Sequence, residues 1–359
     1  MPRRSAETPD ATPGAAASRS TIADVARVAG VSKATVSRFL NRRDELLTRD
    51  IAARVEAAIA ELGYSPSPMA QALKRGRTRL IGLVVADVTN PFSVAVLRGA
   101  EQACQEAGYL VMLFNLGNQA ARELEAIEAL SSYQVEGFIL NTLGSDPAAL
   151  AAATRLGKPV VLVDRRHAGM QSDFVSLDNA GAVLLAAGHL AEQGHGELLF
   201  ISEPTAGVSS RQERAQAFQA FLATHDGHSG HSGQLQGSLF ECDEQHPQAL
   251  DAALLAARQR AGSRRLGVLA SNAVVTLRVA AALARLGWHF GEELGFVGFD
   301  ETEWAPHVGP GLSAIAQPTG DLGRIAARCL LERLQGHQLP PRQTLLPGRL
   351  IVRGSSRKV

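Results

Sequence analysis

The sequence predicts a multidomain protein, with a small all-α unit at the N-terminus and a two-lobed α/β body built on parallel sheets. Three short helical patterns lie within residues 21–62, and from residue 79 onward apolar strand-like runs alternate with helical segments. The chain has 359 residues, enough for two or three domains at about 100–200 residues each. An apolar fraction of 45% can fill cores of that size.

The composition excludes several classes of protein. There is no run of about 18 apolar residues, so we expect no membrane-spanning helix, and the N-terminus lacks the apolar stretch of a secretory signal. The three cysteines, Cys104, Cys242 and Cys329, are odd in number and far apart, which favours a reducing cytoplasm over a disulfide framework. The common metalloprotease, P-loop and dinucleotide motifs are absent, and we expect no cofactor and no metal.

The charge is unevenly distributed along the chain. Residues 1–80 hold 14 Lys and Arg against 8 Asp and Glu, a net charge of +6, whereas the remainder carries 22 against 27, a net charge of −5. A basic front end on an acidic body indicates a module that binds a polyanion, although chance scatter explains charge alone equally well. Residues 1–19, rich in Ala, Pro, Ser and Thr, are expected to form a disordered arm.

The three helical patterns near the N-terminus carry clear start and stop signals. Each follows a hydroxyl residue that can cap a helix: Thr21, Ser32 and Thr48. Asp24 completes a capping box with Thr21, and Gly30 and Gly63 end the first and third helices. A helix, a short turn and a second helix over residues 21–40 is the layout of a helix-turn-helix, whose second helix enters the major groove of DNA.

A further short helix is expected within the stretch Tyr64–Lys74. Ser67 can cap it and Pro68 suits the first helical position, while Gly76 soon closes it. Isolated helices need about 12–15 residues, so this one should form only when something supports it.

The body reads as repeated strand–helix units. The apolar runs are Leu80–Ala86, Leu110–Phe114, Gly137–Leu140, Pro159–Val163, Leu198–Ile201, Leu266–Ala270 and Leu294–Phe299. The helical patterns include Phe92–Ala107, Ala180–Gln193, Arg211–Thr224, Pro247–Gln259 and Ala273–Leu286. Such runs predict parallel sheets covered on both faces, and their total length favours two similar lobes.

The stretch Thr21–Arg38 closely resembles the lactose-repressor (LacI) family of bacterial transcription regulators. Residues 66–73 resemble the hinge helix of that family, and the body resembles its sugar-sensing core and the ribose-type periplasmic sugar-binding proteins. The resemblance spans residues 21–355. It implies a helix-turn-helix head at 20–65, a hinge helix and linker at 66–78, and an effector-binding and dimerisation core at 79–359. One lobe would take about 79–178 and 318–338, and the other about 179–317 and 339–359.

The resemblance also implies the residues that contact DNA. They are Thr21, Ser32, Lys33, Ala34, Thr35, Ser37, Arg38, Leu73 and Lys74. Short hydroxyls suit phosphate contacts, Lys33 can donate to guanine, and Ala34 can pack on a thymine methyl. Arg38 can reach guanine or phosphate. Leu73 matches the residue that wedges into the minor groove, and Lys74 can neutralise phosphate.

Eight polar residues at or after strand ends, together with Phe92, match the sugar-contacting positions of the ribose-type proteins. These are Asn90, Phe92, Asn141, Asp164, Arg165, Arg214, Asn272, Asp300 and Gln317. Ligands of parallel α/β sheets bind beyond the carboxyl ends of the strands. Amide, carboxylate and guanidinium groups together can pair with hydroxyls that both donate and accept, and Phe92 can cover the apolar face of a sugar.

The class of ligand is narrowed by charge. Arg165, Arg211 and Arg214 exceed what a neutral sugar requires, and planar guanidinium groups suit carboxylates or phosphates. The chain is also similar to regulators of gluconate and 2-ketogluconate use. A sugar acid is therefore favoured over a neutral hexose or pentose, and over a nucleobase.

We interpret the sequence as a cytoplasmic, homodimeric transcription regulator, most readily a repressor, that binds double-stranded operator DNA and a sugar or sugar-acid effector. A periplasmic-type sugar-binding protein without regulatory role is the alternative, but it needs a signal peptide and no helix-turn-helix. An enzyme would need a convergent acid–base or nucleophile set, and none stands out. No long heptad follows Arg349, which favours a dimer over a tetramer. His225, His228 and His231 could bind a metal, but a flexible surface loop is favoured.

Overall fold

A computed structural model describes residues 20–41, 47–65, 77–143, 147–167, 169, 171–225 and 235–357. The chain divides into two compact units between Thr78 and Arg79, and each unit is described by itself. The expected arm at 1–19, the expected hinge helix with Leu73 and Lys74, and His228 and His231 lie outside the described residues.

The N-terminal unit consists of three helices around a small core. They are α1 (Ile22–Ala29), α2 (Lys33–Leu40) and α3 (Arg49–Leu62). The predicted caps are confirmed, because the hydroxyls of Thr21, Ser32 and Thr48 each accept a backbone hydrogen bond at a helix start. The core centres on the fully buried Val25, Val36 and Val55, one from each helix.

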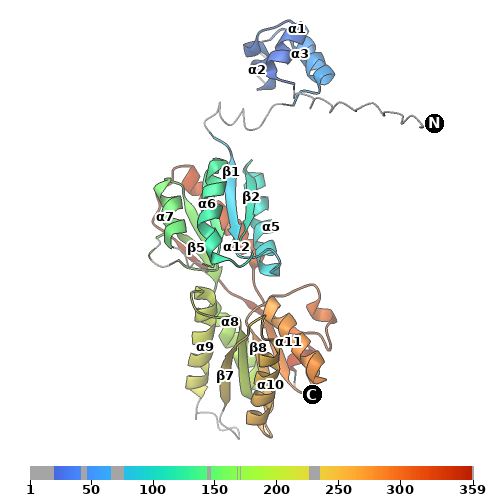
Figure 1. The fold of residues 1–359 in the computed structure, drawn as a ribbon, viewed down its shortest axis with the longest axis vertical. Helices are drawn as coiled ribbons and strands as arrows, with labels where there is room; N and C mark the ends of the chain where they lie inside the picture. The colour runs from blue at the N-terminus through green and yellow to red at the C-terminus, as the bar shows by residue number, and fades with distance from the viewer. Residues whose placement is uncertain are drawn as a thin grey trace, which may run out of the picture. The chain divides into compact units, whose positions relative to one another are not determined.

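The second unit contains two six-stranded sheets, one in each lobe (Figure 1). The first has the order β11-β5-β4-β3-β1-β2 and is parallel throughout, and the second has the order β12-β10-β9-β8-β6-β7 with only β12 antiparallel. The strands are β1 (Leu80–Val85), β2 (Leu110–Asn115), β3 (Gly137–Asn141), β4 (Val160–Val163), β5 (Asp173–Leu177), β6 (His195–Ser202), β7 (Gln236–Glu241), β8 (Arg265–Ala270), β9 (Gly295–Phe299), β10 (Ser313–Ala316), β11 (Gln343–Leu346) and β12 (Arg349–Ile351). The predicted two-lobed parallel architecture is confirmed.

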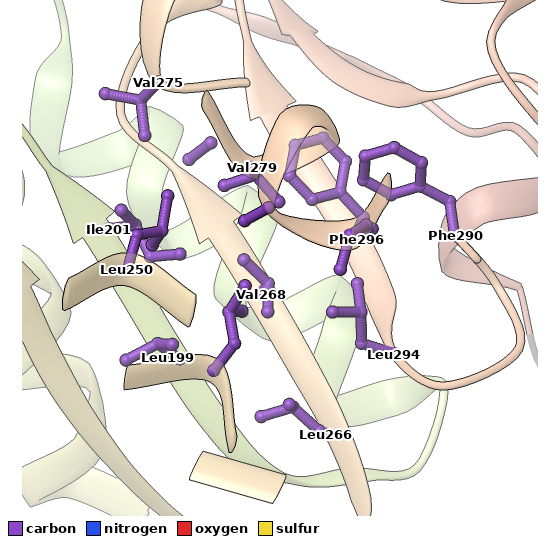
Figure 2. Packing of buried hydrophobic residues seen from close by; sticks show 14 of the residues in the cluster. Leu199, Ile201, Leu250, Leu266, Val268, Val275, Val279, Phe290, Leu294 and Phe296 are labelled. Atoms are coloured by element: carbon purple, nitrogen blue, oxygen red, sulfur yellow. The ribbon is translucent and has the colours of Figure 1, made fainter. Parts of the chain in front are cut away.

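Helices cover both faces of each sheet. On the first sheet, α5 (Pro91–Glu106) and α12 (Thr319–Leu334) bury one face, and α6 (Glu123–Ser132) and α7 (Pro147–Arg155) the other. On the second, α10 (Pro247–Ala261) and α11 (Ala273–Leu286) bury one face, and α8 (Asn179–Glu192) and α9 (Ser209–His225) the other. Figure 2 shows Val268 of β8 beside Val279 of α11, with Phe290 and Phe296 closing the cluster.

The chain crosses between the two lobes three times. The last crossing lies further along the chain than the expected domain limit between residues 338 and 339. Residues 339–359 were expected in the second lobe, but β11 pairs with β5 in the first sheet, and only β12 belongs to the second. The chain therefore crosses after β5, after β10 and again at residues 347–348.

A buried carboxylate explains why β11 stays with the first lobe. Asp173 is 2% exposed and accepts hydrogen bonds from the Arg333 and Arg342 guanidinium groups and from the Arg342 backbone. Burial raises the pKa of Asp173, but these hydrogen bonds outweigh it and lower that pKa to about 2. The ion pairs tie the approach to β11 onto the start of β5.

Helices α5 and α12 pack closely because glycines remove side chains from their contact. A Cβ atom at Gly323 would collide with the backbone oxygen of Val96, and one at Gly99 would collide with that of Gly320. The contact surface is completed by small residues such as Ala100.

We predict that Gly323→Ala lowers the free energy of unfolding of the body by about 1–3 kcal/mol, because the added methyl group overpacks the α5–α12 contact. The measurement is a denaturant titration followed by tryptophan fluorescence, since both tryptophans, Trp288 and Trp304, lie in the body. The control is Gly188→Ala in α8, where a Cβ meets no atom and helix propensity favours Ala by about 0.5–1 kcal/mol. Equal effects of the two substitutions would contradict the packing argument.

Candidate ligand site and nucleic-acid interface

The predicted ligand residues lie at the carboxyl ends of strands or at the helix starts that follow them, in both lobes. In the first lobe, Asn90 and Phe92 begin α5, Asn141 ends β3, and Asp164 and Arg165 follow β4. In the second lobe, Arg214 lies in the first turns of α9, Asn272 caps α11, Asp300 follows β9, and Gln317 follows β10. We call the set Asp164, Arg165, Arg214, Asp300 and Gln317 the charged cluster; its four charged members are buried, and Gln317 is half-buried.

Asp164 holds the two lobes together within the charged cluster. Its Oδ2 lies 3.4 Å from Nε of Arg165 and accepts a hydrogen bond from the Ser210 hydroxyl at 3.2 Å, and its Oδ1 lies 4.0 Å from Nη2 of Arg214. Asp164 belongs to the first lobe, and Ser210 and Arg214 belong to α9 of the second. The backbone of Asp164 has φ 67°, a left-handed conformation that turns the chain sharply at the end of β4.

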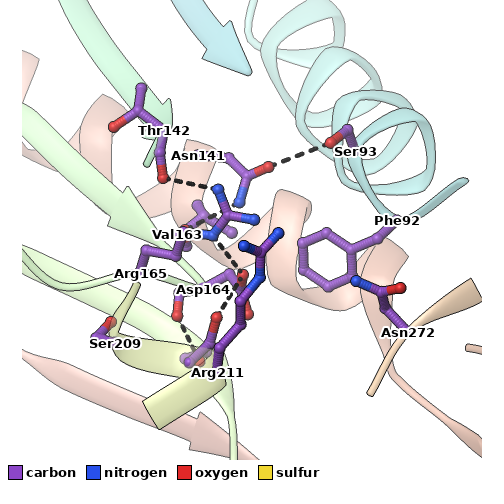
Figure 3. Close-up of polar contacts among 12 residues, drawn as sticks. Phe92, Ser93, Asn141, Thr142, Val163, Asp164, Arg165, Ser209, Arg211 and Asn272 are labelled. Carbon is purple, nitrogen blue, oxygen red and sulfur yellow. Dashed lines mark hydrogen bonds and ion pairs between the residues drawn. The ribbon is translucent and has the colours of Figure 1, made fainter. Parts of the chain in front are cut away.

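Two buried polar atoms of the charged cluster lack a hydrogen-bond partner among the described residues. They are Oδ1 of Asp164 and Nε of Arg165. Arg165 donates from Nη1 to the backbone oxygen of Thr142 at 3.1 Å. Figure 3 shows Arg165 between Thr142 and Asp164, with the ring of Phe92 turned toward the same region. Buried polar atoms are nearly always satisfied, so these two are suited to a hydrogen-bonding ligand.

Arg214 is held by partners on every nitrogen. Nε donates to Oδ1 of Asn179 at 2.8 Å, Nη1 donates to the Ser271 backbone oxygen at 2.5 Å, and Nη2 donates to Gln317 at 3.5 Å. The guanidinium also stacks over the Phe299 ring, 4.4 Å from its centre. Its orientation is therefore fixed before any ligand binds.

Gln317 links Arg214 to Asp300. The Gln317 amide donates to Oδ1 of Asp300 at 2.6 Å, and the Ala273 backbone donates to Oδ2 at 3.0 Å. Burial raises the pKa of Asp300, while the charge of Arg214 acts against that rise. Burial also lowers the pKa of the Arg214 guanidinium, and the Asp164 carboxylate opposes this change.

Three predicted polar residues lie outside the charged cluster. Asn90 caps α5 by accepting from the Phe92 backbone at 3.0 Å. Asn141 is 2% exposed, accepts from the Ser93 hydroxyl and donates to the Val163 backbone oxygen. Asn272 caps α11, and its amide donates to Glu203 at 2.8 Å.

Glu203 weakens the argument that the three arginines near the site carry more positive charge than a neutral sugar requires. Its Oε2 lies 2.6 Å from Nη2 of Arg211, so the positive charge of Arg211 is already paired. Glu203 directly follows β6, and its position after an apolar run was the signal that could have identified it. Asn179 was missed because β5, the strand that precedes it, was not predicted.

The second helix of the N-terminal unit presents its polar side to solvent. Lys33, Ala34 and Arg38 are exposed, whereas Val36 faces the core. The Ser32 hydroxyl accepts from the Thr35 backbone at 3.1 Å and lies 2.9 Å from the Thr35 hydroxyl, so these hydroxyls also hold the helix start.

Thr21 opens the first helix of this unit, and Ser37 lies in the second. Asp24 accepts from the backbone and the hydroxyl of Thr21, and these hydrogen bonds lower the pKa of Asp24 to about 2. The Ser37 backbone oxygen accepts from the Asn41 side chain at 2.5 Å. The head thus combines firmly capped helices with an exposed basic side on α2.

Comparisons with known proteins agree with both units. Residues 21–67 match the model of the lacI family of bacterial regulatory proteins, and residues 187–356 match a periplasmic binding protein-like domain. The transcriptional regulator PtxS of Pseudomonas plecoglossicida is 47% identical over 347 residues, which cover 97% of this chain and 98% of PtxS. KdgR of Bacillus subtilis, another transcriptional regulator, is 35% identical over 93% of this chain and 97% of its own.

The chain belongs to the lacI family of bacterial regulatory proteins. It is therefore a helix-turn-helix, DNA-binding transcription regulator, and the interpretation as a plain sugar-binding protein is set aside. Within the described part of the chain, no helix combines the length and apolarity needed to cross a membrane.

Solved structures of lacI-family proteins have the same fold. The Lac repressor dimer bound to operator and the anti-inducer ONPF has a TM-score of 0.78 at 23% identity, over 94% of this chain and 99% of its own. A lacI-family regulator from Enterococcus faecium with bound ribose has a TM-score of 0.64 at 26% identity, over 78% of this chain and 99% of its own.

We predict that Lys33→Ala relaxes the preference at one base pair in each half-site, at a cost of about 1–3 kcal/mol there, because the family resemblance assigns Lys33 a base contact. Lys74→Ala should instead weaken binding to all sequences and make the salt dependence shallower, since the family resemblance assigns Lys74 a phosphate contact. Binding to a randomised DNA library, measured at several salt concentrations, separates the two effects. If both variants lost affinity without regard to sequence, α2 would not be the helix that reads bases.

Proposed function

We propose that this regulator is a cytoplasmic repressor without catalytic activity, whose affinity for operator DNA is set by a sugar acid such as 2-ketogluconate or gluconate bound at the charged cluster. The supporting observation is the guanidinium of Arg165, which is 8% exposed and has a buried Nε without a hydrogen-bond partner among the described residues. A bound carboxylate would supply the missing acceptor.

Arg165 is the arginine best suited to a carboxylate. Arg211 is paired with Glu203, and all three nitrogens of Arg214 are engaged by the protein. Arg165 uses Nη1 for the Thr142 backbone oxygen, and its one ion pair among the described residues is with Asp164, whose Oδ2 lies 3.4 Å from Nε. The sugar-acid proposal therefore rests on this one guanidinium and no longer on an excess of three.

The other predicted ligand residues suit the hydroxyl groups of the same molecule. Asp164, Asp300 and Gln317 provide acceptors and an amide, and we propose that they contact the sugar with Asn90, Phe92, Asn141, Arg214 and Asn272. A relative that is 30% identical over 94% of this chain is the ribose operon repressor of Escherichia coli, which supports a polyol as the ligand class.

The effector would act through the contact between the lobes. Charged-cluster residues of both lobes already meet at Asp164, and the lobes are joined by three crossings near this point. A ligand changes operator affinity only if it binds one lobe arrangement more tightly than another. Operator affinity measured with and without the effector shows whether the effector releases the regulator from DNA or strengthens its binding to DNA.

The test of the sugar-acid proposal uses a matched pair of ligands, 2-keto-D-gluconate and D-fructose, which differ by a carboxylate in place of a hydroxymethyl group. We predict tighter calorimetric binding of the acid to the wild type. Arg165→Gln should weaken the acid about ten- to a hundredfold, because a charged hydrogen bond is worth about 1.5–3 kcal/mol, and should affect fructose far less.

The control is Arg122→Gln, which removes a half-buried guanidinium of the first lobe whose ion pair is with Glu125. Equal losses for acid and neutral sugar in Arg165→Gln would refute the carboxylate role. Tighter wild-type binding of fructose would overturn the sugar-acid class altogether.

We further propose that the regulator is a homodimer that pairs through exposed apolar side chains of both lobes. These side chains are Val94 of α5, Leu110 and Leu113 of β2, Leu255 of α10 and Leu277 of α11. The strand β2 is the edge of the first sheet, and exposed edges favour pairing or cover. The similar Lac repressor structure is that of a dimer, which supports the same assembly here.

We predict that Leu277→Asp raises the dimer dissociation constant at least about tenfold, because burying a leucine is worth about 1.5–3 kcal/mol and a buried charge is costly. Sedimentation equilibrium measures the constant. Leu184→Asp is the control, because Leu184 is similarly exposed (48% against 53% for Leu277) but lies in α8 on the opposite face of the second sheet. Dimers that resist Leu277→Asp, or that Leu184→Asp also breaks, would place the interface elsewhere.

A further inference from the structure

We propose that Arg166, Glu213 and Asn179 are positioning residues that couple the contact between the lobes to the orientation of Arg214. The inference rests on the proposed ligand site only in that Arg214 belongs to it. The three residues lie outside the charged cluster and form a continuous line of hydrogen bonds from the solvent-accessible boundary between the lobes to its interior.

We call the line of hydrogen bonds from Arg166 through Glu213 and Asn179 to Arg214 the relay. Its first step crosses from one lobe to the other. Nε of Arg166, in the loop after β4, lies 3.3 Å from Oε1 of Glu213 in α9. The first lobe fixes the Arg166 side chain, because its guanidinium stacks 4.1 Å from the centre of the Phe174 ring and donates to Gln343 at 3.3 Å. The Arg166 backbone also donates to the Ser209 hydroxyl at 2.8 Å. The position of the Glu213 side chain therefore depends on the position of the first lobe.

The second step passes from Glu213 to Arg214 through α8. Glu213 and Arg214 are neighbours in sequence, but Asn179 is what connects their side chains. Its Nδ2 donates to Oε2 of Glu213 at 2.8 Å, and its Oδ1 accepts from Nε of Arg214 at 2.8 Å. Asn179 is 2% exposed and Arg214 is 5% exposed, so bulk solvent has little access to replace a lost partner.

The Asn179 side-chain amide has one favoured orientation between Glu213 and Arg214. An asparagine side chain has a donor end and an acceptor end, and here a carboxylate faces the donor while a guanidinium faces the acceptor. If Glu213 loses its charge or its position, the preference that holds the amide in this orientation weakens. A turned amide would present its NH₂ group to Nε of Arg214, which would force Arg214 to move.

The ion pair that begins the relay contributes little to stability by itself. The side chains of Arg166 and Glu213 are 40% and 34% exposed, and exposed pairs are typically weak. If this ion pair positions Arg214 rather than stabilising the fold, its loss should change ligand binding with little change in the unfolding midpoint.

The first test is a double-mutant cycle on the full-length protein with 2-keto-D-gluconate as the calorimetric probe. Arg166→Gln and Glu213→Gln should each weaken binding about three- to tenfold, and the double variant should bind no more weakly than Glu213→Gln alone. Arg166→Lys, which keeps the charge, should restore part of the affinity. Arg122→Gln is the matched control, because its ion pair with Glu125 has the same 3.3 Å length but lies within one lobe.

The second test needs no effector. Hydrogen exchange of the ligand-free protein should become several-fold faster at the start of α8 in Arg166→Gln, with no further increase in the double variant. If 2-keto-D-gluconate does not bind the wild type, the sugar-acid proposal fails and exchange alone decides the relay. Unchanged hydrogen exchange at the start of α8 would overturn the relay. So would a double variant in which the separate effects of the two single substitutions multiply.

Discussion

The arrangement of the body depends on the need to neutralise charges buried between its lobes. Asp164, Arg165 and Arg214 are each at most 8% exposed, and a buried charge left alone is far more costly than one that is paired. No single lobe supplies the full set, since Asp164 comes from the first lobe and Arg214 from the second. Their mutual neutralisation makes the boundary between the lobes a specific contact, and it is also the place where a polar ligand can compete for partners.

The sequence predicted the elements whose signals are local. The caps at Thr21, Ser32 and Thr48 and the apolar strands of the body are found where the patterns placed them. The failures involve residues whose role is set by distant partners. The strand β5 begins with Asp173, a residue untypical of buried strands, and it is accommodated only because Arg333 and Arg342 arrive from far along the chain. The same ion pairs put β11 in the first lobe, which no local pattern indicates.

The candidate site shows a similar division. Strand ends located the ligand residues because backbone topology brings those ends to one edge of a sheet. The pairing of these residues could not be predicted in the same way, because Glu203 neutralises Arg211 through a contact that depends on the path of the loop between β6 and α9. Charge counted along a sequence therefore overestimates the charge offered to a ligand. Of the three candidate arginines, only Arg165 has a buried guanidinium nitrogen without a hydrogen-bond partner among the described residues.

The three crossings between the lobes also determine how the body can be divided. Neither lobe is a continuous stretch of chain, because the first takes α12 and β11 after the second has been largely completed. A gene fragment cut at any single point therefore cannot encode one intact lobe. Shortening the chain to end before β11 would strip an edge strand from each sheet at once, from the first by losing β11 and from the second by losing β12. The short segment that holds β11 and β12 thus completes both sheets, and neither lobe has its full sheet until this segment has been synthesised.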